Sequence, residues 1–260
     1  MSTGVQAIET GLTVLNVLGS HKRPMMLKDI AAAAKMHPAK VHRYLVSFQE
    51  MKYAEQDANG LYRLGINALR LGLACLEQID ALRLASNVLD DLNASTGETV
   101  FAAIWGNNGP TIVQWRDSSR PVTVNVKPGS VLPLLSSATG RTFLAYGDTQ
   151  MLEPFIEQEL ASQKGKSAAT YPGTKKQIKE LIKTTRAEQV GRVIGDLLVG
   201  VNSVSAPVFD HNGTLVLALT MLGSELRFSA ALDAAPVRQL CRTAKAFSAQ
   251  LGYHVLVDDI

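Results

Sequence analysis

The first apolar residues of the chain recur at helical spacing. They lie three or four positions apart and are Val5, Ile8, Leu12, Leu15 and Leu18. This spacing predicts a helix over 5–18 that buries one apolar face. Gly19 and Ser20 end the periodic stretch, and a basic loop follows.

Two further helices are predicted directly after this loop. Residues 27–34 are good helix formers. Pro38 can open the next helix, over 38–48, because the first helical position needs no N–H donor. Val41 and Leu45 would bury one face of that helix, which leaves its basic side chains free to face solvent.

The apolar period then changes from helical to alternating. Residues 53–56 and 61–64 read as two short strands around a turn at 57–60 that contains an Asn-Gly dipeptide. Asn-Gly is the strongest short signal for a two-stranded hairpin. Three helices followed by a hairpin predict a winged helix-turn-helix domain in residues 1–65.

The rest of the chain predicts a linker helix over 66–79 and a second domain over 80–260. The expected helices of that domain are 82–94, 136–146, 151–163, 175–189 and 229–251. The expected strands are 100–105, 111–115, 122–126, 192–194, 204–209 and 215–221. This order predicts an α+β fold, with helices packed on the faces of a sheet.

Composition and charge indicate which class of partner the protein could bind. The chain has 260 residues, 46% of them hydrophobic, which suits two globular domains. Residues 1–70 hold nine Lys or Arg and five acids, an excess of +4, whereas the other 190 residues hold 17 basic and 18 acidic groups. A small basic domain beside a neutral one is typical of a DNA-binding protein with a second function, although ordinary surface charge would give the same count.

Other classes of protein are disfavoured. Cys75 and Cys241 are too far apart in sequence for a disulfide framework or a cysteine zinc site. No secretory signal and no apolar run of about 18 residues is visible, so we expect a cytoplasmic protein. The chain lacks the G-x-S-x-G and H-E-x-x-H motifs and Gly-rich phosphate loops, and its five histidines are scattered. We therefore expect no enzyme, no cofactor and no metal.

Several short blocks of sequence, taken together, resemble the IclR family of bacterial transcriptional regulators along nearly the whole chain. The blocks are 27–31, 41–45, 62–65, 97–100, 132–133, 138–141 and 200–210. The resemblance implies a winged helix-turn-helix, then a GAF/PAS-like α/β domain that binds a small organic acid. It also implies a regulator of a catabolic operon that binds palindromic double-stranded DNA as a dimer or a dimer of dimers. Lys35 stands where the family usually has glycine between the second and third helices.

The resemblance places the third helix in the major groove of DNA, where its basic and aromatic side chains could reach phosphates and base edges. His42 could contact a phosphate or pack at the edge of the helix. Asn59 and Arg63 could touch the DNA backbone or merely complete the hairpin. The candidate DNA contacts are Lys28, Pro38, Ala39, Lys40, His42, Arg43, Tyr44, Asn59 and Arg63.

Small residues at an apparent helix start, 136–140, would leave N–H groups that suit a carboxylate. The alternative is a helix cap with close packing and no ligand. Hydroxyl groups and apolar walls at positions that line the pocket in relatives would complete the site. The candidate effector contacts are Trp105, Leu132, Leu134, Ser136, Ala138, Thr139, Gly140, Ser203, Thr220 and Leu222.

The expected effector is a small organic acid, with an aromatic carboxylate as the first choice. Leu222 replaces a hydroxyl residue found in relatives with small hydrophilic ligands, and an unpaired ligand oxygen costs about 1–3 kcal/mol. An aromatic body instead gains roughly 25 cal/mol per Å² of buried apolar area. Arg116 and Arg141 could pair with a carboxylate, but we expect them at the surface. For Asp196 we favour a structural role, as a cap or in a turn.

One alternative comes from a different class of protein. The second domain could bind a small molecule or act as an enzyme, while the helix-turn-helix served protein contacts only. Salt-dependent binding to a palindromic duplex would separate the two hypotheses, because phosphate contacts release counterions.

Overall fold

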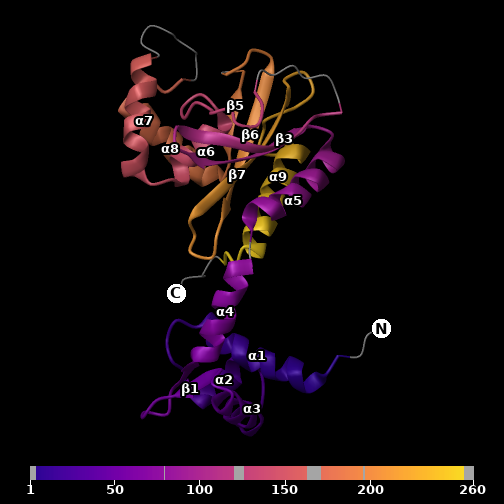
Figure 1. Cartoon of the computed structure of the whole chain (residues 1–260), viewed down its shortest axis with the longest axis vertical. Coiled ribbons are helices and arrows are strands. Elements are labelled where there is room, and N and C mark those ends of the chain that lie inside the picture. The colour runs from indigo at the N-terminus through magenta and orange to yellow at the C-terminus, as the bar shows by residue number, and fades with distance from the viewer. Residues whose placement is uncertain (1–3, 79, 120–125, 163–170, 196, 255–260) are drawn as a thin grey trace. The chain divides into compact units, whose positions relative to one another are not determined.

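The computed structural model describes residues 4–78, 80–119, 126–162, 171–195 and 197–254. The chain divides into two compact units, Met1–Ile79 and Asp80–Ile260. Each unit is traced by element and colour in Figure 1. None of the helices in the described part is long and apolar enough to cross a membrane.

The N-terminal unit contains the helices and the hairpin that the apolar pattern predicts. Its elements are α1 (Gln6–Ser20), α2 (Leu27–Ala33), α3 (Pro38–Glu50), β1 (Ala54–Gln56), β2 (Tyr62–Leu64) and α4 (Ile66–Gln78). The two strands pair antiparallel. Helices α2 and α3 and the hairpin form the winged helix-turn-helix.

The turn between α2 and α3 depends on a residue in the left-handed conformation. Lys35 has φ 52°, so a non-glycine residue occupies a conformation that usually favours glycine. His37 then caps α3, because its Nδ1 accepts the N–H of Ala39 at 3.3 Å. Pro38 follows at the first helical position, where its missing N–H leaves no donor unsatisfied.

The expectation of one buried apolar face on α1 is wrong. Exposed fractions of 61%, 60% and 50% are found for Val5, Ile8 and Leu12. The residues of α1 that are buried are Gly11, Val14 and Leu18. The helix turns its small residue inward because α3 approaches closely there: a Cβ on Gly11 would lie 3.3 Å from both the Tyr44 and Phe48 rings.

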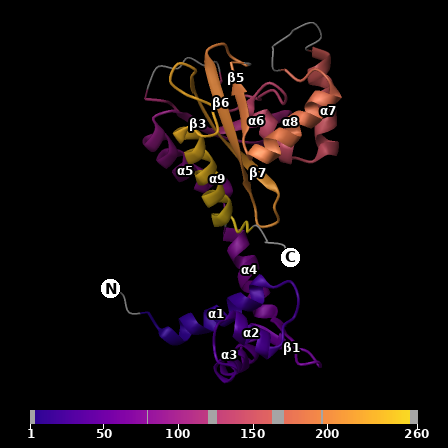
Figure 2. The same ribbon diagram turned by 180° about the vertical axis from the view of Figure 1, so that it is seen from behind.

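The C-terminal unit is built around a five-stranded antiparallel sheet of order β4-β3-β7-β6-β5. Its strands are β3 (Thr99–Gly106), β4 (Gly109–Arg116), β5 (Gly191–Ile194), β6 (Val201–Phe209) and β7 (Leu215–Ser224). Its helices are α5 (Ala81–Thr96), α6 (Ala138–Tyr146), α7 (Thr149–Ser162), α8 (Lys175–Glu188) and α9 (Ala235–Gln250). Helices α5 and α9 cover one face, and α6 and α8 lie on the other, as the two opposite views show (Figures 1 and 2).

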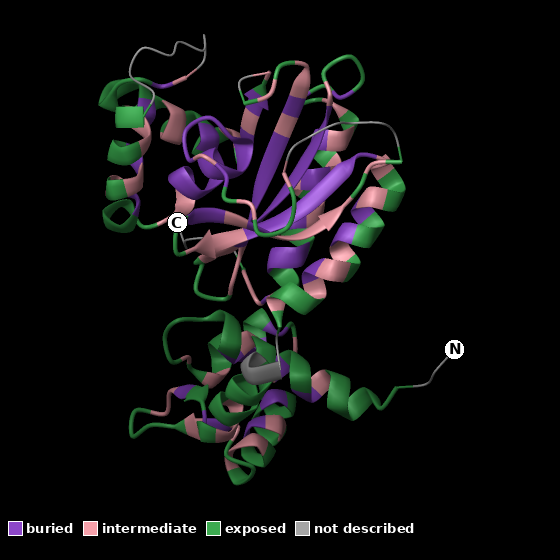
Figure 3. Cartoon of the chain, turned by 45° about the horizontal axis from the view of Figure 1, so that its top comes forward, coloured by how far each residue is buried: buried purple, intermediate pink, exposed green. Residues whose placement is uncertain are grey.

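The core of this unit lies between the sheet and α6. Figure 3 shows buried residues filling the strands, whereas most of the N-terminal unit is exposed. Residues 138–145 of α6 are all buried. Gly140 makes this possible, because a Cβ there would overlap the carbonyl oxygens of Pro133 and Leu134. The loop before α6 therefore packs directly on the helix backbone.

Two predicted helices start later in the structure, and one predicted strand is largely untested. The predicted strand 122–126 falls mostly outside the described residues, and Val126 itself is not in a strand. Helix α6 begins at Ala138, because the Ser137 hydroxyl accepts the N–H of Gly140 and caps the helix. Helix α9 begins at Ala235 rather than 229, because the Ser229 hydroxyl accepts a local N–H and forms a turn instead.

Candidate functional site

The exposed side of α3 carries cations that have no acidic partner. These cations are Lys40 and Arg43 on α3 and Lys28 on α2, all exposed, and the imidazole of His42 is exposed beside them. Within the described part of the N-terminal unit, the one salt bridge joins Arg63 to Glu55 at 3.0 Å. The cations of α2 and α3 are therefore free to meet an external anion, such as a phosphate.

The start of α3 is open to solvent. Pro38 and Ala39 are exposed, and the cap from His37 is made at the surface. The small side chain of Ala39 leaves room for close approach to the helix start. A helix presented in this way can enter the major groove with its first turn foremost.

Three of the candidate DNA contacts also have structural partners. The ring of Tyr44 is half-buried and packs in the core against Gly11. Asn59 forms the hairpin turn, where its N–H donates to the Asp57 carboxylate at 2.9 Å. Arg63 donates from Nε and Nη2 to the Glu55 carboxylate across the two strands. For Asn59 and Arg63 the structure thus shows the hairpin role that the sequence left open as an alternative, whereas the core packing of Tyr44 was not expected.

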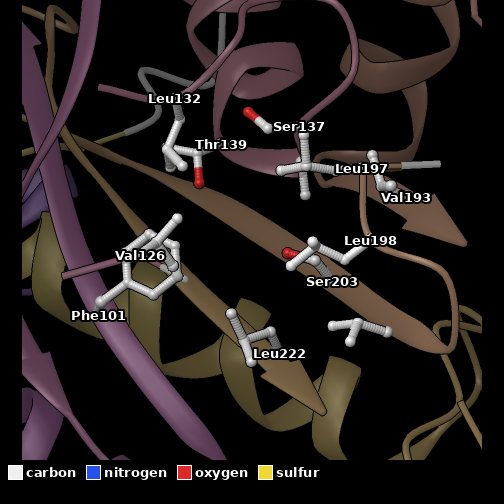
Figure 4. A pocket seen from close by; sticks show the side chains of 12 residues that line it. Phe101, Val126, Leu132, Ser137, Thr139, Val193, Leu197, Leu198, Ser203 and Leu222 are labelled. Carbon is white, nitrogen blue, oxygen red and sulfur yellow. The ribbon is translucent and has the colours of Figure 1, made fainter. Parts of the chain in front are cut away.

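A pocket at the start of α6 gathers half of the candidate effector residues (Figure 4). The candidates that line it are Leu132, Ala138, Thr139, Ser203 and Leu222. The other lining residues are Phe101, Val126, Ser137, Val193, Leu197, Leu198 and Val201. The walls are therefore apolar, with hydroxyl groups from Ser137, Thr139 and Ser203. The volume of the cavity is about 40 Å³, which is room for a few waters.

The other five candidates do not line this pocket. They are Trp105, Leu134, Ser136, Gly140 and Thr220. Trp105 packs edge-on against Phe155 at 5.1 Å. Thr220 is fully buried in β7, and its hydroxyl is shared between those of Thr139 at 2.8 Å and Ser205 at 2.9 Å. This chain of hydroxyls ties the first turn of α6 to the sheet.

The loop that leads into α6 is held by a carboxylate that the sequence analysis did not single out. Glu159, on α7, accepts the N–H of Leu134 at 2.6 Å and that of Leu135 at 3.2 Å. Burial raises the pKa of Glu159, and these N–H donors oppose the rise. Burial and the charge of Glu159 raise the pKa of Tyr171 to about 12. No sequence signal near 134–136 could have indicated Glu159, which lies 24 positions farther along the chain.

The first N–H groups of α6 remain available at the pocket. Among the described residues, no hydrogen bond uses the N–H of Ala138 or Thr139, and both residues line the pocket. The N–H of Gly140 is taken by the Ser137 hydroxyl at 2.8 Å. The residues that carry these two N–H donors line the cavity at the start of α6, and the start of a helix favours a carboxylate.

The two arginines considered as carboxylate partners have structural roles. Arg116 binds Asp90 and the Ser86 hydroxyl at the surface. Arg141 is 6% exposed, so the expectation that it lies at the surface is wrong. Its Nε donates to the carbonyl oxygen of Leu135 at 2.9 Å and thus braces the loop before α6. Asp196 lies outside the described residues.

The described residues contain no group of three or more His, Cys, Asp or Glu side chains that could hold a metal ion. The free thiols of Cys75 and Cys241 lie in different units. The groups that the two regions present are cations and an open helix start in one, and hydroxyls, N–H donors and apolar walls in the other.

Comparisons with known proteins match both units of the chain. Residues 7–58 match the model of the IclR helix-turn-helix domain, and residues 73–249 match that of the bacterial transcriptional regulator IclR C-terminal domain. The glycerol operon regulatory protein of Streptomyces coelicolor is 28% identical over 262 residues, covering 97% of this chain and 98% of the relative. The DNA-binding transcriptional repressor YiaJ of Escherichia coli is 24% identical and covers 98% and 91%.

Solved structures match over the same length. The crystal structure of Pseudomonas aeruginosa HmgR is 36% identical to this chain with a TM-score of 0.87, covering 96% of this chain and 99% of that one. The repressor BlcR of Agobacterium tumefaciens is 21% identical with a TM-score of 0.79, covering 98% and 100%, which is a likeness of fold.

Proposed function

The chain belongs to the IclR family of bacterial transcriptional regulators, which are DNA-binding proteins and not enzymes, and from this premise we propose a ligand-responsive regulator of a catabolic operon. Its N-terminal unit binds a palindromic operator in double-stranded DNA. Its C-terminal unit binds a small organic acid, with an aromatic carboxylate as the first choice. A relative from Streptomyces coelicolor is named as a regulator of the glycerol operon.

The surface of α3 carries the DNA-binding part of this proposal. Lys40 and Arg43 are exposed and form no salt bridge with any described residue, and Pro38 and Ala39 at the start of the helix are exposed. Lys28 and the hairpin residues Asn59 and Arg63 would flank the groove, against the phosphate backbone. Phosphate contacts of this kind give affinity and register, while side chains near the start of the helix contact base edges.

The pocket at α6 supports the choice of effector. The N–H groups of Ala138 and Thr139 suit a carboxylate, and the Phe101 and Leu222 side chains suit an aromatic ring. A cavity of about 40 Å³ is too small for a benzoate-sized body, so binding moves a wall of the pocket. A ligand that favours one arrangement of the walls shifts the protein between two states, which is how a site in one unit can alter DNA affinity in the other.

We also propose that α4 (Ile66–Gln78) serves as the linker helix expected between the domains, and that the protein is a dimer or a dimer of dimers. Ile66, Leu69 and Leu73 are exposed on α4 by 42%, 57% and 50% and recur at helical spacing. Val5, Ile8 and Leu12 form a second exposed apolar row on α1. Exposed rows of large apolar side chains are typical of an interface. Light scattering at micromolar concentration is expected to show at least a dimer, and a monomer with and without DNA would contradict this.

One pair of measurements tests the proposal. Selection of duplexes from a random pool is expected to return a palindrome whose affinity falls steeply as salt rises. Calorimetric titration with benzoate and with pyruvate then tests the effector. Binding of benzoate supports the aromatic assignment, whereas binding of pyruvate alone contradicts it. Failure to select any duplex would contradict the DNA-binding role assigned to α3.

A further inference from the structure

A second and larger cavity lies at the other end of α6. Its volume is about 450 Å³, and it is lined by residues of α6, β6, α9 and the segment after α9. The first pocket touches the first turn of α6, whereas this cavity touches Tyr146, the last residue of that helix. The two pockets share no lining residue. We refer to the larger one as the α6–α9 cavity.

The α6–α9 cavity exists because β5 is shorter than β6. Strand β5 starts at Gly191, opposite Ser205, so residues 206–209 of β6 have β7 alone as a neighbour in the sheet. Pro207 lies in this uncovered stretch and has no N–H to offer to an added strand. A hollow at an uncovered strand of this kind suits a small molecule better than another strand.

The walls of the cavity are aromatic. The Phe209 ring lies between those of Tyr146, at 5.2 Å, and Tyr253, at 5.0 Å. Neither tyrosine hydroxyl forms a hydrogen bond with any described residue, so both are free to donate to a ligand. Burial raises the pKa of Tyr146 above its ordinary value of 10, so its hydroxyl remains a donor well above neutral pH. The site thus offers flat apolar surface with phenolic donors at its rim.

The charge of the cavity is positive. Among the described residues that line it, Lys245 is the only one with a full charge. Arg186 lies near enough for its charge to act on the Tyr146 hydroxyl. Cys241 adds a soft apolar wall, because burial raises the pKa of its thiol and keeps it neutral. The positive charges of Lys245 and Arg186 and the tyrosine hydroxyl donors favour a ligand that carries an anionic group.

We propose that the α6–α9 cavity is a second ligand site, specific for a planar aromatic anion. The ring of the ligand packs against Phe209 and the two tyrosine rings. Its acidic group binds the Lys245 ammonium and the hydroxyls of Tyr146 and Tyr253. The site is independent of the proposed effector pocket, although α6 and β6 contribute residues to both. Ser203 and Phe209 lie six positions apart on β6, which is about 20 Å along an extended strand.

Calorimetric titration with 2-naphthoate tests this site in the full chain. The neutral amide of the same ring, 2-naphthamide, is expected to bind at least tenfold more weakly. Lys245→Met and Tyr253→Phe are each expected to weaken naphthoate binding at the α6–α9 cavity by about five- to thirtyfold, which corresponds to about 1–2 kcal/mol. Lys183→Met, which removes an exposed charge from α8, is the matched control and should leave the affinity unchanged.

A variant with a blocked effector pocket distinguishes binding at the α6–α9 cavity from binding at the effector pocket. Ser203→Leu places a larger side chain in the effector pocket and should leave naphthoate binding at the α6–α9 cavity intact. Retained binding in Ser203→Leu together with loss in Lys245→Met supports the proposal. Loss of all binding in Ser203→Leu, equal binding in Lys245→Met and the parent chain, or no binding by the parent chain would overturn it. Tryptophan fluorescence confirms folding of each variant, because Trp105 and Trp115 both lie in this unit.

Discussion

Helices α3 and α6 both begin directly after a side chain that caps their first turn, His37 for α3 and Ser137 for α6. Their surroundings are opposite. The third residue of α3 is Lys40, which is exposed, and the third residue of α6 is Gly140, where even a Cβ would overlap the preceding loop. Figure 3 shows the same contrast between the two units as a whole.

The difference shows how a capped helix start can serve either recognition of DNA or recognition of a small molecule. An uncovered helix start with free cations can contact a long, charged surface such as a DNA groove. A helix start enclosed by a loop and a sheet can contact only a small molecule, and it transmits any displacement to the elements packed around it. The substitutions below are paired between the units, so that each tests this contrast.

Gly140→Ala is expected to have the largest effect on stability. Its Cβ would meet the carbonyl oxygens of Pro133 and Leu134, so we expect a loss of about 2–3 kcal/mol in the unfolding free energy of the C-terminal unit. Lys40→Ala, at the same position of α3, should change stability by less than about 0.5 kcal/mol. Urea unfolding followed by tryptophan fluorescence and circular dichroism measures both. Equal effects at the two positions would contradict the contrast.

Arg43→Ala is expected to weaken binding to the selected palindrome by about 1–3 kcal/mol, since an exposed arginine on α3 would contact a base or a phosphate. Lys179→Ala removes an exposed cation from α8 and should leave affinity unchanged. Fluorescence anisotropy at two salt concentrations gives both affinities. If both variants bind as the parent chain does, Arg43 is not at the DNA interface.

Thr220→Val is expected to destabilise the C-terminal unit by about 1–2 kcal/mol. It removes a fully buried hydroxyl and leaves those of Thr139 and Ser205 with one partner fewer. The comparison is Thr13→Val on α1, whose exposed hydroxyl bonds only the carbonyl of Glu9 in its own helix. That variant should stay within about 0.5 kcal/mol of the parent chain. A cost for Thr220→Val no greater than for Thr13→Val would argue against the hydroxyl chain.

Titration of Glu159 is expected to change the unfolding free energy by less than the substitutions above, and the change depends on pH. Burial raises its folded-state pKa above the usual 4.5, so its contribution to stability is present below about pH 4.5 and lost as pH rises through the folded-state pKa. Glu159→Gln does not titrate. The unfolding free energy of the parent chain, relative to this variant, should therefore fall between pH 4.5 and pH 7. Glu50→Gln supplies the comparison for an exposed helix, and a pH-independent difference for Glu159→Gln would contradict the account.

Prediction from sequence succeeded where the evidence lies within one element. The helices of the N-terminal unit and the Asn-Gly hairpin follow from local periodicity and turn residues. So does the order of strands and helices in the C-terminal unit, apart from the strand expected over 122–126. The apolar face of α1 was predicted wrongly because two apolar rows share that helix. The contact of Gly11 with Tyr44 and Phe48 decides which row is buried, and that contact is tertiary.

The candidate sites show the same limit. On α3, helical spacing predicts that Val41 and Leu45 are buried and that Lys40 and Arg43 are exposed, and both expectations are confirmed. The pocket at α6 draws lining residues from four separate stretches of chain, and Phe101, Val193 and Leu198 carry no local signal. Glu159 and Arg141 act through backbone groups of the loop before α6, so their partners have no side-chain signature in the sequence.

The affinity of the chain for its selected palindrome, with and without benzoate at a fixed salt concentration, tests the central claim most directly. The claim is that a ligand bound at the enclosed start of α6 controls DNA binding at the open start of α3. The account predicts a change of about five- to 150-fold in Kd once calorimetry shows the site to be saturated. An unchanged Kd under saturation, or no benzoate binding at all, would contradict it.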